Sequence, residues 1–438
     1  MSYWAQRRDF LHESSLTAHW SFARDCLSIG GMILRARFLL PIDGPPIEDG
    51  AVAIEGNRVV AVGGAADVMA GNAGPVEDLG DVALMPGLIN AHCHLDYSMM
   101  RHAINPPKSF TAWVKRINAL KRSLDDDDYL AAIAKGFAES KKWGTTTIGN
   151  IESFPELMLR LPPSPVRTWW FHEMIDIRHR LPTERAMAGA LSFFAAKTRP
   201  LDFFGLSPHA PYTASATLYR LARECSGQLA MPLTTHVAES REEVEMFRDK
   251  AGPLYEFLDG LQRPMADCGG HSPFTYLWRS GAIDATWILV HMNELDEEDF
   301  GILGGLRRGA GPHIVHCPGS HRYFRHTEFQ FRRLHELGMN ICVATDSLAS
   351  TYSLSLLEEL RDLQGTNPWL TPEELLRTVT VNPARALKME HRLGEIAPGA
   401  LADLIALPVS GNVGSVHEEI LSYTQPVPWM MIDGNVVS

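Results

Sequence analysis

The feature that most constrains the fold of this 438-residue chain is a regular alternation between residues 84 and 350. Short apolar runs that end in polar residues alternate there with longer amphipathic stretches, such as 128–143 and 216–226, whose apolar residues have helical spacing. The eight apolar runs are 84–90, 145–150, 166–171, 203–207, 233–235, 287–290, 314–316 and 341–345. A strand–helix unit repeated eight times, with strands apolar on both faces, is typical of a closed parallel barrel. The sequence therefore predicts an α/β fold built on a (β/α)8 barrel.

Both ends of the chain contain segments that favour strands outside this barrel. Residues 32–41 read as a strand, and residues 50–63 read as a hairpin with its turn at 55–57. The segments 399–407 and 429–437 are strand-like again. We expect the two ends to pair with each other and to form one small β-sandwich domain.

These patterns divide the chain into four parts. They are an N-terminal extension (1–31), the first part of the small β domain (32–83), the barrel (84–390) and the second part of the small β domain (391–438). Residues 1–31 have no strand-like partner, so we expect either an extension or a protein whose native start is Met32.

Composition and targeting signals indicate where such a protein works. The chain has 40 Lys and Arg against 52 Asp and Glu, a net charge of −12, which disfavours binding to nucleic acids and to anionic membranes. It has neither a membrane-length apolar window nor a secretory signal. Its six cysteines are scattered without a Cys-x-x-Cys pair, as reduced thiols are. We therefore expect a cytoplasmic location.

Polar residues with metal-binding chemistry follow several of the apolar runs. His92 and His94 flank Cys93 after the first run, and alternation along an extended segment puts both imidazoles on one side. The others are His236 and Glu239 after the fifth run, His291 after the sixth and Asp346 after the eighth. A structural role would account for each of these residues singly. Because the carboxyl ends of barrel strands meet at one face, the set as a whole predicts a site for a borderline ion such as Zn²⁺.

These residues stand in a recognisable sequence context. Residues 85–94 read Met-Pro-Gly-Leu-Ile-Asn-Ala-His-Cys-His, and they are followed along the chain by His236-x-x-Glu239, His291 and Thr345-Asp346-Ser347. In these motifs the chain resembles the amidohydrolase superfamily. Within it, the chain is similar to the branch of nucleoside and nucleobase deaminases that act on adenosylhomocysteine, methylthioadenosine, aminofutalosine, guanine and cytosine. The resemblance covers about residues 32–438.

The resemblance implies a role for each matching residue. His92, His94, His236 and Asp346 would hold one divalent metal ion, most simply zinc, with iron as the alternative. Glu239 would carry protons, His291 would orient the attacking water, and Asp346 would also accept a proton from that water. The run 203–207 is followed by no lysine that could bridge two metals, which disfavours the dinuclear branches of the superfamily.

Four further residues are candidates for substrate binding. In the resembling deaminases the position of His209 contacts the sugar, and the aromatic at the position of Trp113 helps to line the cavity. A buried core histidine and an ordinary packed tryptophan are the alternatives. Arg178 and Arg180 follow the third run and could pair with a substrate carboxylate, although a solvated loop explains them equally well.

The sequence as a whole predicts a metal-dependent hydrolase that releases ammonia from an adenine-type nucleoside such as aminofutalosine, adenosylhomocysteine or methylthioadenosine. The alternatives are another amidohydrolase reaction, namely guanine, pterin or cytosine deamination, cyclic amide hydrolysis or triazine dechlorination, and a barrel that binds without catalysis. The expected partner is a small-molecule substrate. The resemblance is also compatible with a homo-oligomer.

Overall fold

The computed structural model describes residues 31–176, 183, 187–189 and 199–437. Residues 1–30 of the predicted extension lie outside this part of the chain. So do the predicted substrate-binding residues Arg178 and Arg180.

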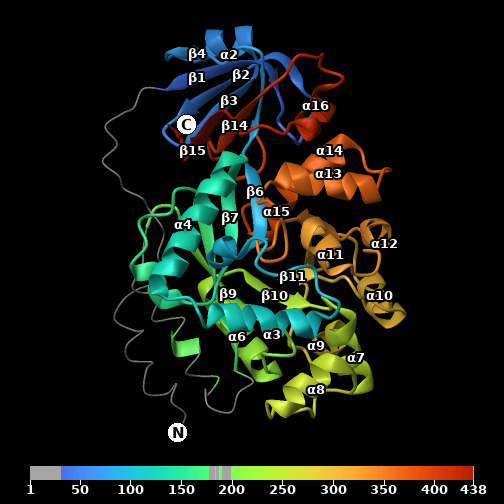
Figure 1. Cartoon of the computed structure of the whole chain (residues 1–438). Helices are drawn as coiled ribbons and strands as arrows, with labels where there is room; N and C mark the ends of the chain where they lie inside the picture. Colours follow the sequence, from blue (N-terminus) through green and yellow to red (C-terminus); the bar gives the residue numbers. More distant parts are fainter. Residues whose placement is uncertain (1–30, 177–182, 184–186, 190–198, 438) are drawn as a thin grey trace.

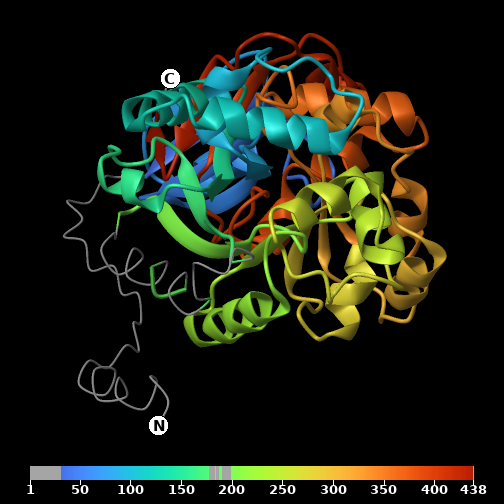
Figure 2. The ribbon, with the colours of Figure 1, turned by 60° about the horizontal axis from the view of Figure 1, so that its bottom comes forward.

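Eight parallel strands, neighbours in chain order, form the central sheet (Figures 1 and 2). They are β6 (Leu88–Cys93), β7 (Thr145–Glu152), β8 (Arg167–Met174), β9 (Asp202–Pro208), β10 (Leu233–Val237), β11 (Trp287–His291), β12 (His313–His316) and β13 (Asn340–Val343). The edge strands β6 and β13 meet through a parallel bridge between Cys93 and Asp346, where the Asp346 backbone N–H donates to the His92 carbonyl oxygen at 3.2 Å. The sheet therefore curls into the predicted barrel, and the contact that brings its edges together lies at the carboxyl ends of the strands.

Helices follow the barrel strands and surround them in the second view (Figure 2). They are η1 (Leu95–Met100), α3 (Phe110–Lys121), α4 (Asp126–Lys142), η2 (Pro155–Leu159), α6 (Ala216–Leu229), α7 (Arg241–Asp249), α8 (Gly252–Gly260), α9 (Pro273–Arg279), α10 (Glu297–Gly304), α11 (Pro318–Phe324), α12 (Phe331–Glu336), α13 (Leu356–Thr366), α14 (Pro372–Arg377) and α15 (Val381–Ala386). Helices α4 and α6 agree with the predicted helices 128–143 and 216–226 to within a turn. Each presents buried apolar residues to the barrel, as their periodicity predicts.

A second sheet joins the two ends of the chain, drawn in blue and red in Figure 1. From the N-terminal side come β1 (Met32–Leu39), β2 (Ile47–Glu55), β3 (Arg58–Gly64), α2 (Ala65–Gly71), β4 (Val76–Asp78) and β5 (Val82–Pro86), and from the C-terminal side β14 (Leu404–Pro408), α16 (Val416–Ser422), β15 (Trp429–Ile432) and β16 (Asn435–Val436). Strand β14 pairs antiparallel with β5, and β5 pairs parallel with β1. The predicted pairing of the two ends is thus confirmed. The described strands form one continuous sheet, and the two-layered sandwich stays a prediction.

The first apolar run, residues 84–90, is not one strand. Strand β5 ends at Pro86 in the small sheet and β6 begins at Leu88 in the barrel, so the expected boundary between residues 83 and 84 falls inside β5. Gly87 forms the junction, and a Cβ at this position would collide with the side chain of Thr146. The chain passes from one sheet to the other where only glycine fits.

Within the described part of the chain, no helix combines the length and the apolar character needed to cross a membrane.

Candidate active site

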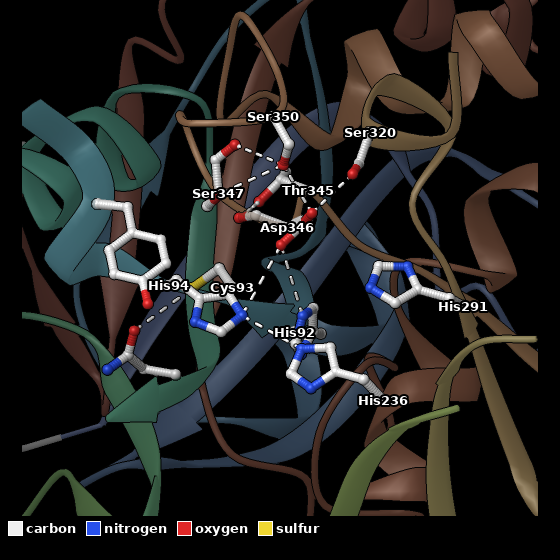
Figure 3. Close-up of polar contacts among 12 residues, drawn as sticks. His92, Cys93, His94, His236, His291, Ser320, Thr345, Asp346, Ser347 and Ser350 are labelled. Atoms are coloured by element: carbon white, nitrogen blue, oxygen red, sulfur yellow. Dashed lines mark hydrogen bonds and ion pairs between the residues drawn. The ribbon is translucent and has the colours of Figure 1, made fainter. Parts of the chain in front are cut away.

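Five of the predicted polar side chains converge at the carboxyl ends of the barrel strands (Figure 3). His92 lies in β6 and His94 directly follows it, His236 lies in β10, His291 ends β11, and Asp346 follows β13. Nε2 of His94 lies 3.3 Å from Nε2 of His236. Oδ1 of Asp346 lies 3.7 Å from Nε2 of His92 and 3.8 Å from Nε2 of His94. The strand ends thus bring together residues that are up to 254 positions apart in the chain.

Hydrogen bonds on the outer side of this cluster orient two of its members. Nδ1 of His236 lies 2.9 Å from the carbonyl oxygen of His209 and must donate to it. Oδ2 of Asp346 accepts from the hydroxyls of Ser320 and Ser350, each at 2.7 Å (Figure 3). The inner atoms, Nε2 of His236 and Oδ1 of Asp346, therefore keep lone pairs directed toward the centre of the cluster.

The cluster has the donor set of a divalent metal site. Both ring nitrogens of His92 and Nδ1 of His94 are buried without a hydrogen-bond partner among the described residues. Candidate ligand atoms lie within 4.8 Å of one another in two overlapping groups, His92 with His94 and Asp346, and His92 with His236 and His291. A buried nitrogen without a partner is costly, and a cation at the centre would satisfy Nε2 of His92. Imidazoles with one carboxylate suit zinc and its neighbours in the first transition row.

The electrostatics of the cluster favour ligation. Burial lowers the pKa of His94 and the pKa of His291, each to about 3, so both imidazoles are neutral and keep a free lone pair. Burial raises the pKa of Asp346, but His92, His291 and His94 together lower it more, so the carboxylate is ionised. Neutral imidazoles and an ionised carboxylate are the forms that bind metal.

Glu239 lies on the cavity side of this cluster. Its Oε1 is 3.6 Å from Nε2 of His291, and its backbone N–H donates to Oε2 of the buried Glu243 at 2.8 Å. Burial, with the charges of Asp346 and Glu243, raises the pKa of Glu239 well above its ordinary value. The raised pKa favours the protonated carboxyl group, which can donate its proton to a molecule in the cavity.

The backbone around the cluster is held in an unusual conformation. Ala238, His291 and Asp346 have positive φ angles of 51°, 77° and 56°, in the left-handed region that residues other than glycine seldom adopt. Such strain persists only where the surrounding structure enforces it, and it concentrates at functional sites. Here it lies at or directly after the carboxyl ends of β10 and β11 and three residues after the end of β13.

The model of the amidohydrolase family matches residues 83–437 of this chain. The chain belongs to the amidohydrolase family. The resemblance inferred from the motifs is thereby confirmed.

Similar proteins include several deaminases. A 5-methylthioadenosine/S-adenosylhomocysteine deaminase of Pyrococcus furiosus is 28% identical over 373 residues, which cover 82% of this chain and 80% of the relative. An aminodeoxyfutalosine deaminase of Deinococcus radiodurans is 28% identical over 349 residues, which cover 77% of this chain and 81% of the relative. A solved adenosine deaminase of Xanthomonas campestris with bound zinc has a TM-score of 0.77 at 24% identity and covers 92% of both chains. This last likeness shows a shared fold.

Beside the cluster, this member of the amidohydrolase family has a cavity of about 430 Å³. One part of its wall is apolar, with Trp113 and Ile117 from α3 and Leu254 and Phe257 from α8. Trp113 lines the cavity, and its ring also contacts Phe324, with the ring centres 5.0 Å apart. This residue therefore belongs both to the packing and to the cavity wall. The apolar wall and the polar cluster together suit a flat ring with one polar edge.

His209 also lines the cavity, and its ring centre is 5.0 Å from that of His236. Its Nδ1 lies 2.5 Å from the hydroxyl oxygen of Thr213, and that hydroxyl donates to the carbonyl oxygen of Ala210 at 3.2 Å. Nδ1 of His209 is thus held by Thr213, while Nε2 has no hydrogen-bond partner among the described residues. His209 is therefore positioned to contact a ligand rather than being satisfied within the core.

Several residues of the site were not predicted from the sequence. Ser320 and Ser350 hold Asp346, while Lys121 and Glu173 line the cavity. Glu173 had one signal, since it closely follows the run 166–171, but nothing in the sequence shows that it meets His209. Lys121 ends an amphipathic helix, where a lysine ordinarily faces water and the helix dipole, and neither serine stands in a motif.

Proposed function

We propose that this protein is a metal-dependent hydrolase that deaminates an adenine-type nucleoside. The observation that carries the proposal is the position of Glu239, a buried carboxyl group with a raised pKa, between the histidine and aspartate cluster and the cavity. The deaminase names of the relatives support an amino-substituted purine as the ring that is attacked. Aminodeoxyfutalosine, S-adenosylhomocysteine and 5-methylthioadenosine, which those names contain, are the first substrates to test.

In this proposal, four residues hold the ion: His92, His94, His236 and Asp346. The orphaned nitrogens of His92 and the zinc in the similar adenosine deaminase structure support zinc, with iron as the alternative. Once bound, the ion supplies Lewis acidity that makes hydroxide available from water near neutral pH.

The chain's own residues then move the protons. Oδ1 of Asp346 accepts a proton from the attacking water, while the hydroxyls of Ser320 and Ser350 keep that oxygen turned inward by holding Oδ2. His291 is neutral, and its Nε2 orients the water. Glu239 donates its proton to the ring nitrogen next to the carbon that is attacked.

The reaction balances with water as the only co-reactant. The water oxygen forms a bond to the ring carbon that bears the exocyclic amine, and the bond from that carbon to the amine nitrogen breaks. The proton held by Asp346 passes to the departing amine, and the proton of the added hydroxyl passes to Glu239, which thereby regains the proton that it gave to the ring nitrogen. Ammonia leaves, and an amidine becomes a cyclic amide. No oxidant or reductant is required.

The residues that line the cavity limit which groups the substrate can carry beyond the ring that is attacked. Arg263 lines the cavity, but its guanidinium already donates to both carboxylate oxygens of Asp267, at 2.7 and 2.6 Å, and to the Tyr212 carbonyl oxygen at 3.0 Å. It is therefore not free to bind a distal acid. Arg178 and Arg180, which lie outside the described residues, stay the predicted partners of an acidic appendage. A small uncharged appendage fits the apolar wall of α3 and α8.

The proposal is tested by ammonia release from adenosine, 5′-deoxyadenosine and the three candidate substrates, with guanine and cytosine included. Glu239→Gln should keep its metal and lose turnover by about 10²- to 10⁴-fold, because the amide cannot donate the proton. Glu256→Gln, on the exposed face of α8, is the matched control and should match the wild type. If the metal-loaded protein releases no ammonia from any of these compounds, or if Glu239→Gln keeps its turnover, the proposal fails.

A further inference from the structure

A carboxylate that the proposed chemistry does not use faces the cavity next to His209. Glu173 near the end of β8 and His209 directly after β9 both line the cavity, and their strands are paired neighbours. Oε1 of Glu173 lies 3.9 Å from Nε2 of His209, which is too far for a hydrogen bond. The side chain of Glu173 is only 7% exposed, and it belongs to the lining of the cavity.

The other contacts of Glu173 hold its carboxylate in place. Its Oε2 accepts from the hydroxyl of Ser153 at 2.6 Å, while Oε1 has no hydrogen bond within the described part of the chain. Burial raises the pKa of Glu173, but the positive charge of Lys121 and the hydrogen bond from Ser153 act in the opposite direction, and the pKa lies below its ordinary value. The group is thus an ionised acceptor with one oxygen anchored and one oxygen free.

Glu173 and His209 therefore offer two polar atoms that have no hydrogen-bond partner among the described residues. Oε1 of Glu173 can only accept a hydrogen bond, and Nε2 of His209 donates or accepts according to its tautomer. These two atoms, 3.9 Å apart, are complementary to two O–H groups on neighbouring carbon atoms, because a hydroxyl can both donate and accept. The imidazole of His209 lies beside that of His236, one of the proposed metal ligands. Hydroxyl groups bound at His209 would therefore lie close to the substrate ring that is attacked.

We propose that Glu173, together with His209, recognises a pair of neighbouring hydroxyl groups on the sugar of the substrate, and that Glu173 sets the preference for a ribonucleoside over its deoxy analogues. For the identity of the substrate ring, this inference rests on the proposed function. Recognition of the hydroxyl pair can be measured as a difference in binding affinity and does not require turnover. Ser153 and Lys121 act through Glu173, by anchoring Oε2 and by supplying positive charge.

The test compares substrates with and without the hydroxyl pair. Wild type, Glu173→Gln, Ser153→Ala and the control Glu156→Gln, whose side chain is exposed on η2, would be assayed with adenosine and with 2′,3′-dideoxyadenosine. Values of kcat/KM would be obtained from ammonia release. Dissociation constants would be measured in parallel by calorimetry.

Hydrogen bonds to a charged group lead us to expect the wild type to favour adenosine by about 10- to 100-fold. Glu173→Gln should reduce this preference about tenfold or more by weakening adenosine alone, Ser153→Ala should reduce it less, and Glu156→Gln should leave it unchanged. Equal loss for both nucleosides in Glu173→Gln would show a structural role and overturn the inference. A wild type that does not discriminate, or that binds neither nucleoside, would overturn it without any variant.

The two proposals fail separately. A protein that releases no ammonia but binds adenosine more tightly than its dideoxy analogue, through Glu173, would refute the deamination and support the hydroxyl recognition. A protein that deaminates both nucleosides equally well would support the deamination and refute the hydroxyl recognition.

Discussion

Nδ1 of His236 donates to the carbonyl oxygen of His209 at 2.9 Å, and this bond leaves Nε2 of His236 unprotonated 3.3 Å from Nε2 of His94. A backbone carbonyl therefore fixes the tautomer of the imidazole, as in many metal sites. Burial and the neighbouring histidines lower the pKa of His236 well below its ordinary value, which favours the neutral ring with its lone pair on Nε2. This lone pair is available to a metal ion placed between the two Nε2 atoms.

The first prediction concerns this pair. His236→Ala removes one of the four proposed ligands and should lower the bound metal to well below one ion per chain, as measured by elemental analysis after dialysis. The control is His271→Ala, because His271 is partly exposed and pairs with Glu298 away from the cluster. Unchanged metal content in His236→Ala would remove His236 from the ligand set.

The second prediction concerns the groups that hold Asp346. Replacing both Ser320 and Ser350 by alanine removes the two hydroxyls that orient Oδ2, so the carboxylate should turn away from the metal. The affinity for zinc should fall about 10- to 100-fold, which a competing chelator measures. Ser422→Ala, which removes only a hydroxyl that donates to the Glu419 carbonyl oxygen, should leave the affinity unchanged. An unchanged affinity in the double variant would mean that the barrel backbone alone positions Asp346.

The ligand cluster could be predicted from the sequence because each member directly ends or follows an apolar run. A strand buried on both faces of a parallel barrel leaves that signature, and the fold then brings the strand ends together. His92, His291 and Asp346 were located in this way although they are far apart in the chain. The pattern of apolar residues predicts the barrel, and the barrel brings the ligand residues at its strand ends together.

Features that depend on pairing between distant segments could not be predicted in the same way. Residues 84–90 read as one apolar run because β5 and β6 are both apolar. Only the pairing of β5 with β14 assigns β5 to the small sheet rather than to the barrel. Lys121 ends a helix like any solvated lysine, yet its Nζ donates to the Tyr97 hydroxyl at 2.6 Å inside the cavity wall. Arg178 and Arg180 lie outside the described residues, so their proposed contact with a substrate acid stays a prediction.

The third prediction concerns the contact between the barrel and the small sheet. Arg167 at the start of β8 donates to both carboxylate oxygens of Asp403, at 2.8 and 3.1 Å, and each of these two side chains is 3% exposed. Arg167→Ala would leave a buried carboxylate without its partner and should destabilise the protein by about 3–5 kcal/mol. Arg160→Ala removes an exposed ion pair and should cost about 1 kcal/mol or less.

Thermal unfolding of the two variants, followed side by side, checks this difference. Arg167→Ala should unfold at a clearly lower temperature than Arg160→Ala. Equal unfolding temperatures would mean that water or another cation replaces Arg167 beside Asp403.

The fourth prediction follows from the charge that Lys121 supplies to Glu173. The pKa of Glu173 lies below its ordinary value because its neighbours, Lys121 among them, outweigh burial, which acts in the opposite direction. Lys121→Met removes one of the groups that lower this pKa and leaves burial in place, so the pKa of Glu173 should rise. As pH falls through the raised pKa, Glu173 takes up a proton and Oε1 is no longer a charged acceptor.

The acid limb of the profile of kcat/KM for adenosine should therefore move to higher pH in Lys121→Met, with most of the loss in KM. The profile for 2′,3′-dideoxyadenosine, which lacks the hydroxyl pair, should move much less. Lys108→Met removes an exposed lysine just before α3 and should leave both profiles unchanged. If the two nucleosides instead shift together in Lys121→Met, the lysine acts on the metal cluster through Tyr97, whose ring stacks on that of His94 with the ring centres 5.2 Å apart. That outcome would separate the charge of Lys121 from the binding of the sugar.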